Sequence, residues 1–146
     1  MTPYECQDGD ITISTDPARL DLDFVHGFLA NESYWAKGIE RDRVERFVEH
    51  SLNFGLYKAG EQVGYLRIIT DYTTYAHISD VFVHAAHRGQ GLAQMLMRCA
   101  LAHPELQGLR KWTLYTHDAQ SLYYRFGFRV PPTPGNHMVY RVPNER

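Results

Sequence analysis

The chain has 146 residues, 44% of them hydrophobic and 13% aromatic, which excludes a disordered protein and predicts one domain over residues 1–146 with a substantial core. Its net charge of −2 excludes the strongly basic surface that nucleic-acid-binding proteins use. No segment has the pattern of a signal peptide or the length of an apolar membrane span, so we expect a cytoplasmic protein that contacts no membrane.

The first half of the chain is predicted to form a strand followed by two helices. Alternating side chains predict the strand over 11–15. Asp16 and Pro17 then supply an N-cap and a first helical residue, and the apolar stripe that follows predicts one helix ending near Asn31. A loop of aromatic and polar residues spans 31–38. The second helix carries the apolar stripe Val44, Phe47 and Val48.

The second half of the chain alternates strands with helices. Ala59 and Gly60 between two strand-like runs predict a hairpin. A proline-rich turn over 131–135 precedes the last predicted strand. The expected elements are strands over 53–58, 62–70, 75–83, 111–116 and 137–142, and helices over 91–103 and 119–126.

The two cysteines, Cys6 and Cys99, are far apart in the sequence. A disulfide framework is therefore not expected, and a reducing compartment fits this usage better. Cys99 falls on the apolar face of a predicted helix, so we expect it to be buried and chemically inert.

The most informative segment is the passage from Val81 to Ala93, where a predicted strand enters a helix through Arg-Gly-Gln-Gly. Glycines allow a ligand to approach the backbone, and the free N–H groups and dipole of a helix N-terminus favour a phosphate. The spacing matches neither the P-loop nor the dinucleotide fingerprint. The segment therefore predicts a phosphate site of another kind, and the alternative is that the glycines only form a tight turn.

Two segments together resemble the conserved motifs A and B of the GNAT superfamily of N-acetyltransferases. Residues 88–93 fit Arg/Gln-x-x-Gly-x-Gly/Ala, and residues 119–128 fit Ala-x-x-Leu-Tyr-x-x-x-Gly-Phe. The resemblance implies an α/β (α+β) fold in which helices flank both faces of a mixed, mostly antiparallel sheet and two central strands splay apart. It implies acetyl-CoA as cosubstrate and no metal.

The resemblance also implies which residues bind the cofactor: strand backbone for the pantetheine arm, loop amides for the pyrophosphate, and two positions near motif B. These are Val81, Phe82, Val83, Arg88, Gly89, Gln90, Gly91, Leu92, Ala93, Thr116 and Tyr123. Many family members have Asn where this chain has Thr116. A threonine still offers one hydrogen bond, but the usual amide contact is missing.

The acid and the base of the reaction are assigned by different routes. The family's motif places Tyr123 beside the cofactor sulfur as the acid, or as a hydrogen-bond donor to the thiolate; the alternative is a packing role. Strand alternation puts His77, Ser79, Val81 and Val83 on one face and Asp80 on the other. His77 suits a base because it titrates near neutral pH, although it can equally be a structural histidine. Asp80 can orient a water or support the loop at 34–35.

The loop between the first two helices is expected to cover the acceptor site, as it does in the family. Glu32, Tyr34 and Trp35 are its candidate substrate-binding residues, with the aromatic pair forming an apolar or cation-binding wall. The alternative is that the aromatics only fasten the loop to the core. His84 and His87 lack further ligands at useful spacing, so we expect no metal site.

The sequence thus predicts an N-acetyltransferase that transfers the acetyl group of acetyl-CoA to a primary amine of a small molecule, by direct attack in a ternary complex. A protein N-terminus or lysine is the alternative acceptor. A non-catalytic acyl-CoA sensor is the alternative from another class. The expected partner is the small amine, without nucleic acid or membrane, and edge strands make a homodimer a further candidate.

Overall fold

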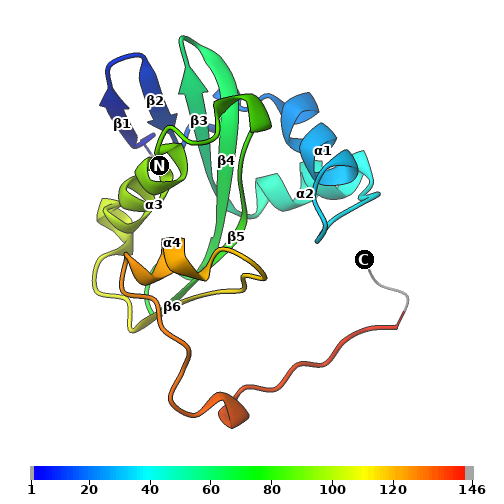
Figure 1. The fold of residues 1–146 in the computed structure, drawn as a ribbon, viewed down its shortest axis with the longest axis vertical. Helices are drawn as coiled ribbons and strands as arrows, with labels where there is room; N and C mark the ends of the chain where they lie inside the picture. Colours follow the sequence, from blue (N-terminus) through cyan, green and yellow to red (C-terminus); the bar gives the residue numbers. More distant parts are fainter. Residues whose placement is uncertain (1, 144–146) are drawn as a thin grey trace.

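A computed structural model of the chain describes residues 2–143, and its centre is a six-stranded sheet in the order β1-β2-β3-β4-β5-β6 (Figure 1). All neighbouring strands pair antiparallel except β5 and β6, which are parallel. The mixed, mostly antiparallel sheet implied by the sequence is therefore confirmed. The strands are β1 Glu5–Asp8, β2 Ile11–Ser14, β3 Leu52–Lys58, β4 Glu61–Thr70, β5 Tyr75–Val83 and β6 Lys111–Leu114.

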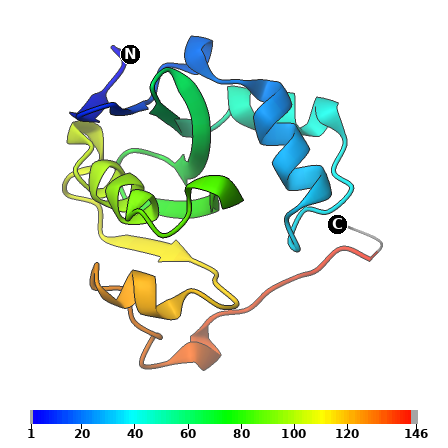
Figure 2. The ribbon, with the colours of Figure 1, turned by 45° about the horizontal axis from the view of Figure 1, so that its top comes forward.

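Helices cover both faces of this sheet, as expected. Helices α1 (Leu22–Asn31) and α2 (Arg41–Glu49) lie on one face, and α3 (Leu92–Leu101) lies on the other (Figures 1 and 2). The short helix α4 (Gln120–Tyr124) contributes Tyr123 to the same apolar cluster as α3. Within the described residues, no helix is both long and apolar enough to cross a membrane.

The core is split by the sheet into two apolar clusters. The larger one joins α3 to the inward side chains of β2 to β5, including Phe54, Leu66 and Leu96. The smaller one joins α1 and α2 to Tyr65 and Phe82. Because side chains point to alternate faces along a strand, strands β4 and β5 supply different residues to each of the two clusters.

The N-terminal region differs from the prediction in two ways. Strand β1, which the sequence did not predict, pairs with β2. The single helix expected after Pro17 is a 3-10 turn, Pro17–Arg19, followed by α1. The break has a local cause: the Asp21 side chain accepts a hydrogen bond from the Phe24 N–H at 3.1 Å and caps α1, while the Asp21 N–H donates to Gln62 at 2.8 Å.

The predicted last strand, 137–142, is wrong within the described residues. The chain after α4 forms a 3-10 turn, Pro134–Asn136, and then runs extended toward the end of α1 without joining the sheet (Figure 2). Prolines at 131, 132 and 134 fix the backbone angles of the stretch just before residues 137–142, and within the described residues no strand pairs with them. The segment is tied back at His137, whose ring nitrogen lies 2.8 Å from the Tyr115 hydroxyl.

The expectation that the cysteines stay unpaired is also wrong. Cys6 on β1 and Cys99 on α3 form a disulfide that spans 93 residues of sequence, with a Cα–Cα distance of 6.2 Å. Their sequence separation hid this contact, because β1 lies at the sheet edge beside the C-terminal half of α3. The bond fastens the N-terminal hairpin to the helix. The cytoplasmic location, argued partly from free cysteines, stays a prediction.

Candidate active site

The loop between β5 and α3 has the features of an anion cradle. Gly89 and Gly91 have φ angles of 79° and 75°, a left-handed conformation that favours glycine. A Cβ at either position would meet no atom within 4 Å, so the loop is open to a ligand. Gly91 is the N-cap of α3 and offers no side-chain cap, which leaves the first-turn N–H groups free for an anion. These residues fit the pyrophosphate that the resemblance implies.

The side chains around this loop hold it in place. Arg88 folds back and donates through Nε to the Val83 carbonyl at 3.0 Å. Leu92 is buried in the larger core and Ala93 is half-buried, so both anchor the helix start. Lys58, at the end of β3, lies with Nζ 3.2 Å from the Gln90 side chain and brings a positive charge to the loop. The sequence did not single out Lys58, because nothing local marks a strand-end lysine as part of a distant loop.

A β-bulge in β5 changes which side chains share a face. The pairing with β4 matches Arg67 to Ser79 and Tyr65 to Phe82, so two residues, Asp80 and Val81, face the single residue Leu66. Asp80 adopts a φ of 54° at this point. Val81 and Val83 pack with the α3 cluster, and Phe82 packs with α1 and α2.

The bulge overturns the face assignment made from simple alternation. Ser79 and Asp80 both contact Arg67 on the α1/α2 side, and His77 shares their face, whereas Val81 lies on the opposite one. Alternation fails here because one extra residue shifts every later side chain to the other face. The side chains of Phe82 and Val83 are buried in the core, so only their backbone is available to a cofactor.

A candidate active-site cavity opens where β5 and β6 separate. Their parallel pairing ends at Ile78 and Leu114, while β5 continues to Val83, which confirms the expected splay. A cavity of about 440 Å³ lies in this gap, lined by both strands, the residues after β6, Tyr123 and the aromatic pair Tyr34 and Trp35. A larger hollow of about 720 Å³ lies between β6, α4 and the C-terminal segment. The smaller cavity is the candidate site because it alone contains His77, Asp80 and Val81.

Tyr123 lines this cavity from α4. Its side chain is 8% exposed and packs edge-on against Phe128 at a ring distance of 6.2 Å. Burial raises the pKa of Tyr123 to about 12, with smaller contributions from Tyr34 and Asp118. The phenol is therefore protonated at neutral pH. It can donate a hydrogen bond to a thiolate, but full proton transfer to a thiol of pKa about 8.5 would cost about 5 kcal/mol.

His77 lines the same cavity from β5. Its Nδ1 lies 2.7 Å from the Thr113 hydroxyl on β6, and its ring is 5.2 Å from that of Tyr115. Burial lowers the pKa of His77, the Arg67 charge lowers it further, and Asp80 acts in the opposite direction. The imidazole is therefore neutral at physiological pH, the form a general base needs.

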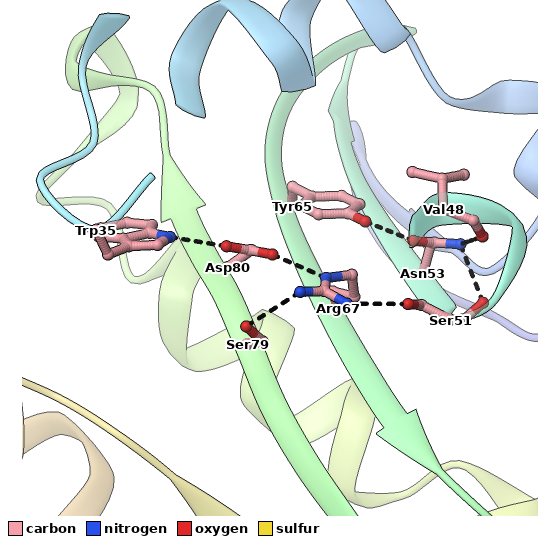
Figure 3. A network of polar contacts seen from close by, with 8 residues as sticks. All are labelled: Trp35, Val48, Ser51, Asn53, Tyr65, Arg67, Ser79 and Asp80. Carbon is pink, nitrogen blue, oxygen red and sulfur yellow. Dashed lines mark hydrogen bonds and ion pairs between the residues drawn. The ribbon is translucent and has the colours of Figure 1, made fainter. Parts of the chain in front are cut away.

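Asp80 is not free to act as the base (Figure 3). Its Oδ2 accepts from Arg67 Nε at 2.8 Å, and its Oδ1 accepts from Trp35 Nε1 at 2.7 Å. The residue is 8% exposed. Both carboxylate oxygens thus have fixed partners, and the second role considered for Asp80, support of the loop at 34–35, is the one the structure shows.

The loop between α1 and α2 reaches the cavity through its aromatic pair. Buried Ser33 shapes the turn: its hydroxyl donates to the Leu29 carbonyl at 2.7 Å and accepts from the Ala36 N–H at 3.0 Å. Tyr34 is mostly exposed and lies edge-on to Trp35 at a ring distance of 5.0 Å. Glu32 is exposed at the end of α1 and does not line the cavity.

Comparison with known proteins agrees with this architecture. The acetyltransferase (GNAT) domain family matches residues 49–130. The chain belongs to the GNAT family. A candidate GNAT acetyltransferase structure from Xanthomonas campestris pv. campestris is 44% identical, covers 91% of this chain and 94% of its own, and superposes with a TM-score of 0.88.

Two proteins with lower sequence identity also resemble this GNAT protein, one in sequence and one in fold. A candidate acetyltransferase of Gibberella zeae is 29% identical over 143 residues, covering 83% of this chain and 80% of its own. A predicted acetyltransferase of Clostridium acetobutylicum, solved with acetyl-CoA, is 11% identical, covers 90% of this chain and 91% of its own, and shares the fold with a TM-score of 0.61.

Thr116 and His84 each use a side-chain atom to accept a hydrogen bond from a nearby backbone N–H. The Thr116 hydroxyl accepts from the Ala119 N–H at 3.0 Å and so caps the turn that leads into α4, while its residue lines the cavity. His84 uses its Nδ1 to accept from the Ala86 N–H at 3.2 Å. Within the described residues no group of three or more His, Cys, Asp or Glu side chains lies close enough to hold a metal ion.

Proposed function

We propose that this GNAT acetyltransferase uses acetyl-CoA to acetylate a primary amine of a small molecule within a ternary complex. The observation that carries the proposal is the cavity at the β5–β6 splay, where the bulged backbone, Tyr123 and His77 line one space. The open loop at the start of α3 supports cofactor binding. The Clostridium acetobutylicum fold neighbour solved with acetyl-CoA adds support from the fold alone.

The acceptor must lose a proton before it can attack. An alkylammonium of pKa about 10.4 costs about 4.6 kcal/mol to deprotonate at pH 7. His77 is neutral, half-buried and on the cavity wall, so it is the group placed to accept this proton directly or through a water. In the tautomer whose Nδ1 donates to the Thr113 hydroxyl, Nε2 carries the lone pair that accepts the proton.

The remaining groups act on the acyl transfer itself. Acetyl-CoA, when bound, supplies the thioester carbonyl and the thiolate leaving group. The β5 bulge interrupts the regular register with β4, and backbone N–H groups there would polarise the carbonyl oxygen. Tyr123 stays protonated and stabilises the departing sulfur through a hydrogen bond.

The cavity favours a small acceptor over a protein. A volume of about 440 Å³ is on the scale of small-molecule sites, and Tyr34 and Trp35 close one side of it. An aromatic wall suits the alkyl chain and the positive charge of an amine before deprotonation. A peptide N-terminus or lysine remains the alternative acceptor, since its terminal atoms would enter the same space.

The test is thiol release from acetyl-CoA across a panel of polyamines, amino sugars, amino acids and short peptides, with Tyr123→Phe beside the wild type. Release with a small amine that falls in the variant supports the proposal. Release only with peptides overturns the small-molecule assignment. Saturable acetyl-CoA binding without release from any acceptor overturns catalysis and favours the sensor.

A further inference from the structure

Arg67 stands at the centre of a polar network beneath the acceptor loop, and no role has yet been assigned to it. Its side chain on β4 is only 14% exposed. Besides the ion pair with Asp80, its guanidinium donates to the Ser51 hydroxyl at 3.1 Å and to the Ser79 hydroxyl at 3.4 Å (Figure 3). Its Cζ also lies 4.0 Å from the centre of the Phe47 ring. The planar guanidinium of an arginine can make these hydrogen bonds and stack on the ring at the same time, whereas the single ammonium group of a lysine cannot.

The contacts of Arg67 gather segments that are distant in sequence. Phe47 belongs to α2, Ser51 precedes β3, and Ser79 and Asp80 belong to β5. Neighbouring Asn53 extends the network, since its Nδ2 donates to the Val48 carbonyl at 2.9 Å and the Tyr65 hydroxyl donates to its Oδ1 (Figure 3). Arg67 thus holds the Asp80 carboxylate at a fixed place above the sheet, at the residue where β5 bulges.

The Asp80 carboxylate connects Arg67 to the loop between α1 and α2. Its second oxygen accepts from the indole N–H of Trp35, the one described side-chain hydrogen bond that joins the 34–35 pair to the sheet. Trp35 in turn lies 6.5 Å from the Phe28 ring and edge-on to Tyr34, so its orientation sets that of the cavity wall. Charge-assisted bonds to a buried carboxylate are directional and strong.

We propose that Arg67 is a positioning residue for the acceptor: through Asp80 it fixes Trp35 as one wall of the acceptor pocket. This inference rests on the proposed function, because it assigns the wall to acceptor binding. Arg67 itself does not line the cavity, so it acts only through the carboxylate.

The kinetic test separates acceptor binding from chemistry. In Arg67→Met we expect the acceptor KM to rise about tenfold, the size of one lost bond to a charged group, with kcat at saturating acceptor and the acetyl-CoA Kd changed less than about twofold. Trp35→Phe removes only the indole N–H and should give a similar rise. The double variant should be no worse than the worse single variant, since both break one chain of contacts.

A matched control variant distinguishes this result from the effect of a general loss of stability. Arg19→Met also removes an arginine paired with a carboxylate, Glu5 at 2.8 Å, and stacked on an aromatic ring, Tyr57 at 4.7 Å, but far from the cavity. Its acceptor KM should stay within about twofold of wild type. An unchanged KM in Arg67→Met, an equal rise in Arg19→Met, or additive effects in the double variant would overturn the proposal.

A second readout does not require turnover. In a Trp112→Phe background Trp35 is the sole tryptophan, and acrylamide quenching of its fluorescence should increase about twofold in Arg67→Met because the loop is released. If Arg67→Met does not fold, Arg67→Lys, which keeps the charge, should give a smaller rise in both quenching and acceptor KM. Unchanged quenching contradicts the positioning role. Increased quenching in a protein that acetylates no acceptor would reject the proposed function while retaining the Arg67–Asp80–Trp35 link.

Discussion

The two faces of the sheet are built from different kinds of contact. The face covered by α3 holds eighteen buried residues of the larger cluster, against six in the cluster beneath α1 and α2. The α3 face also carries the Cys6–Cys99 disulfide. The other face instead carries the buried ion pair of Arg67 and Asp80 and its hydrogen bonds.

This difference matches the two tasks that the proposed function gives to the two faces. A large apolar cluster holds α3 rigidly, so the cofactor loop at its N-terminus keeps a fixed shape. A polar network stabilises less per contact, but it fixes direction, which suits a loop that must orient an acceptor. We therefore expect changes on the α3 face to affect cofactor binding, stability or chemistry, and changes on the α1/α2 face to affect the acceptor and the pH dependence.

The largest effect is expected at the cofactor loop. Gly91→Asp places a negative charge and a side chain where the pyrophosphate should bind, and it should raise the acetyl-CoA Kd about 1,000-fold through the loss of two or more charge-assisted hydrogen bonds. Isothermal titration calorimetry measures this. The matched control is Gly108→Asp, whose φ of 86° is equally unfavourable for a side chain but whose position is remote. Tight binding by Gly91→Asp would refute the anion cradle.

The second-largest effect tests how much the disulfide on the α3 face contributes to stability. Cys6→Ser opens a covalent loop of 93 residues and should lower the free energy of unfolding by about 3 kcal/mol. Urea unfolding of the wild type with and without a thiol reductant measures the same quantity. The reductant should have no effect on Cys6→Ser, and the acceptor KM of the folded variant should not change. If reduction leaves wild-type stability unaltered, the cysteines are not bonded in solution.

A smaller effect is expected for Tyr123, which belongs to the α3-face cluster but acts in the cavity. Tyr123→Phe keeps the ring packing and removes the hydrogen bond to the leaving thiolate, so kcat should fall about 30-fold while acetyl-CoA affinity is retained. Steady-state kinetics at saturating cofactor measure this change. Tyr124→Phe, at the adjacent and more exposed position, is the control and should remain near wild type. Equal turnover in the two variants would remove Tyr123 from the mechanism.

The smallest effect concerns pH on the α1/α2 face. Because burial and Arg67 lower the pKa of His77, the acidic limb of the kcat profile should lie below pH 6.5. The lowered pKa also means that the folded state resists protonation, so this contribution to stability is present above about pH 6.5 and is lost as the pH falls.

The His77 assignment is tested by its own variant. His77→Gln should lower kcat about tenfold and abolish the acidic limb. His117→Gln changes another histidine of the same cavity and should leave the limb in place. A limb that survives in His77→Gln would show that another group, or the acceptor itself, titrates there.

Much of the fold could be predicted because its signals are local. Strand β5 begins and ends where its pattern predicted, Tyr75–Val83, since alternation and flanking turns mark it on both sides. The two glycines of the loop before α3 lie between a strand and a helix, as the glycine-rich pattern predicted, and they adopt left-handed angles there. The expectations that failed depended on contacts between segments that are distant in the sequence. The strand expected at 137–142 has the right side-chain pattern, but a strand also needs a partner edge, and no described strand lies paired with it.

By itself the sequence indicated the family and singled out the loop before α3 and Tyr123 as candidates, because each of these signals lies within one short segment. Only the tertiary structure decided the roles of Cys6, Arg67 and Asp80. Their partners lie 93, 13 and 45 residues away, on Cys99, Asp80 and Trp35 respectively. One bulged residue in β5 then reversed the faces of the strand beyond it, an event that periodicity cannot reveal because it breaks the period.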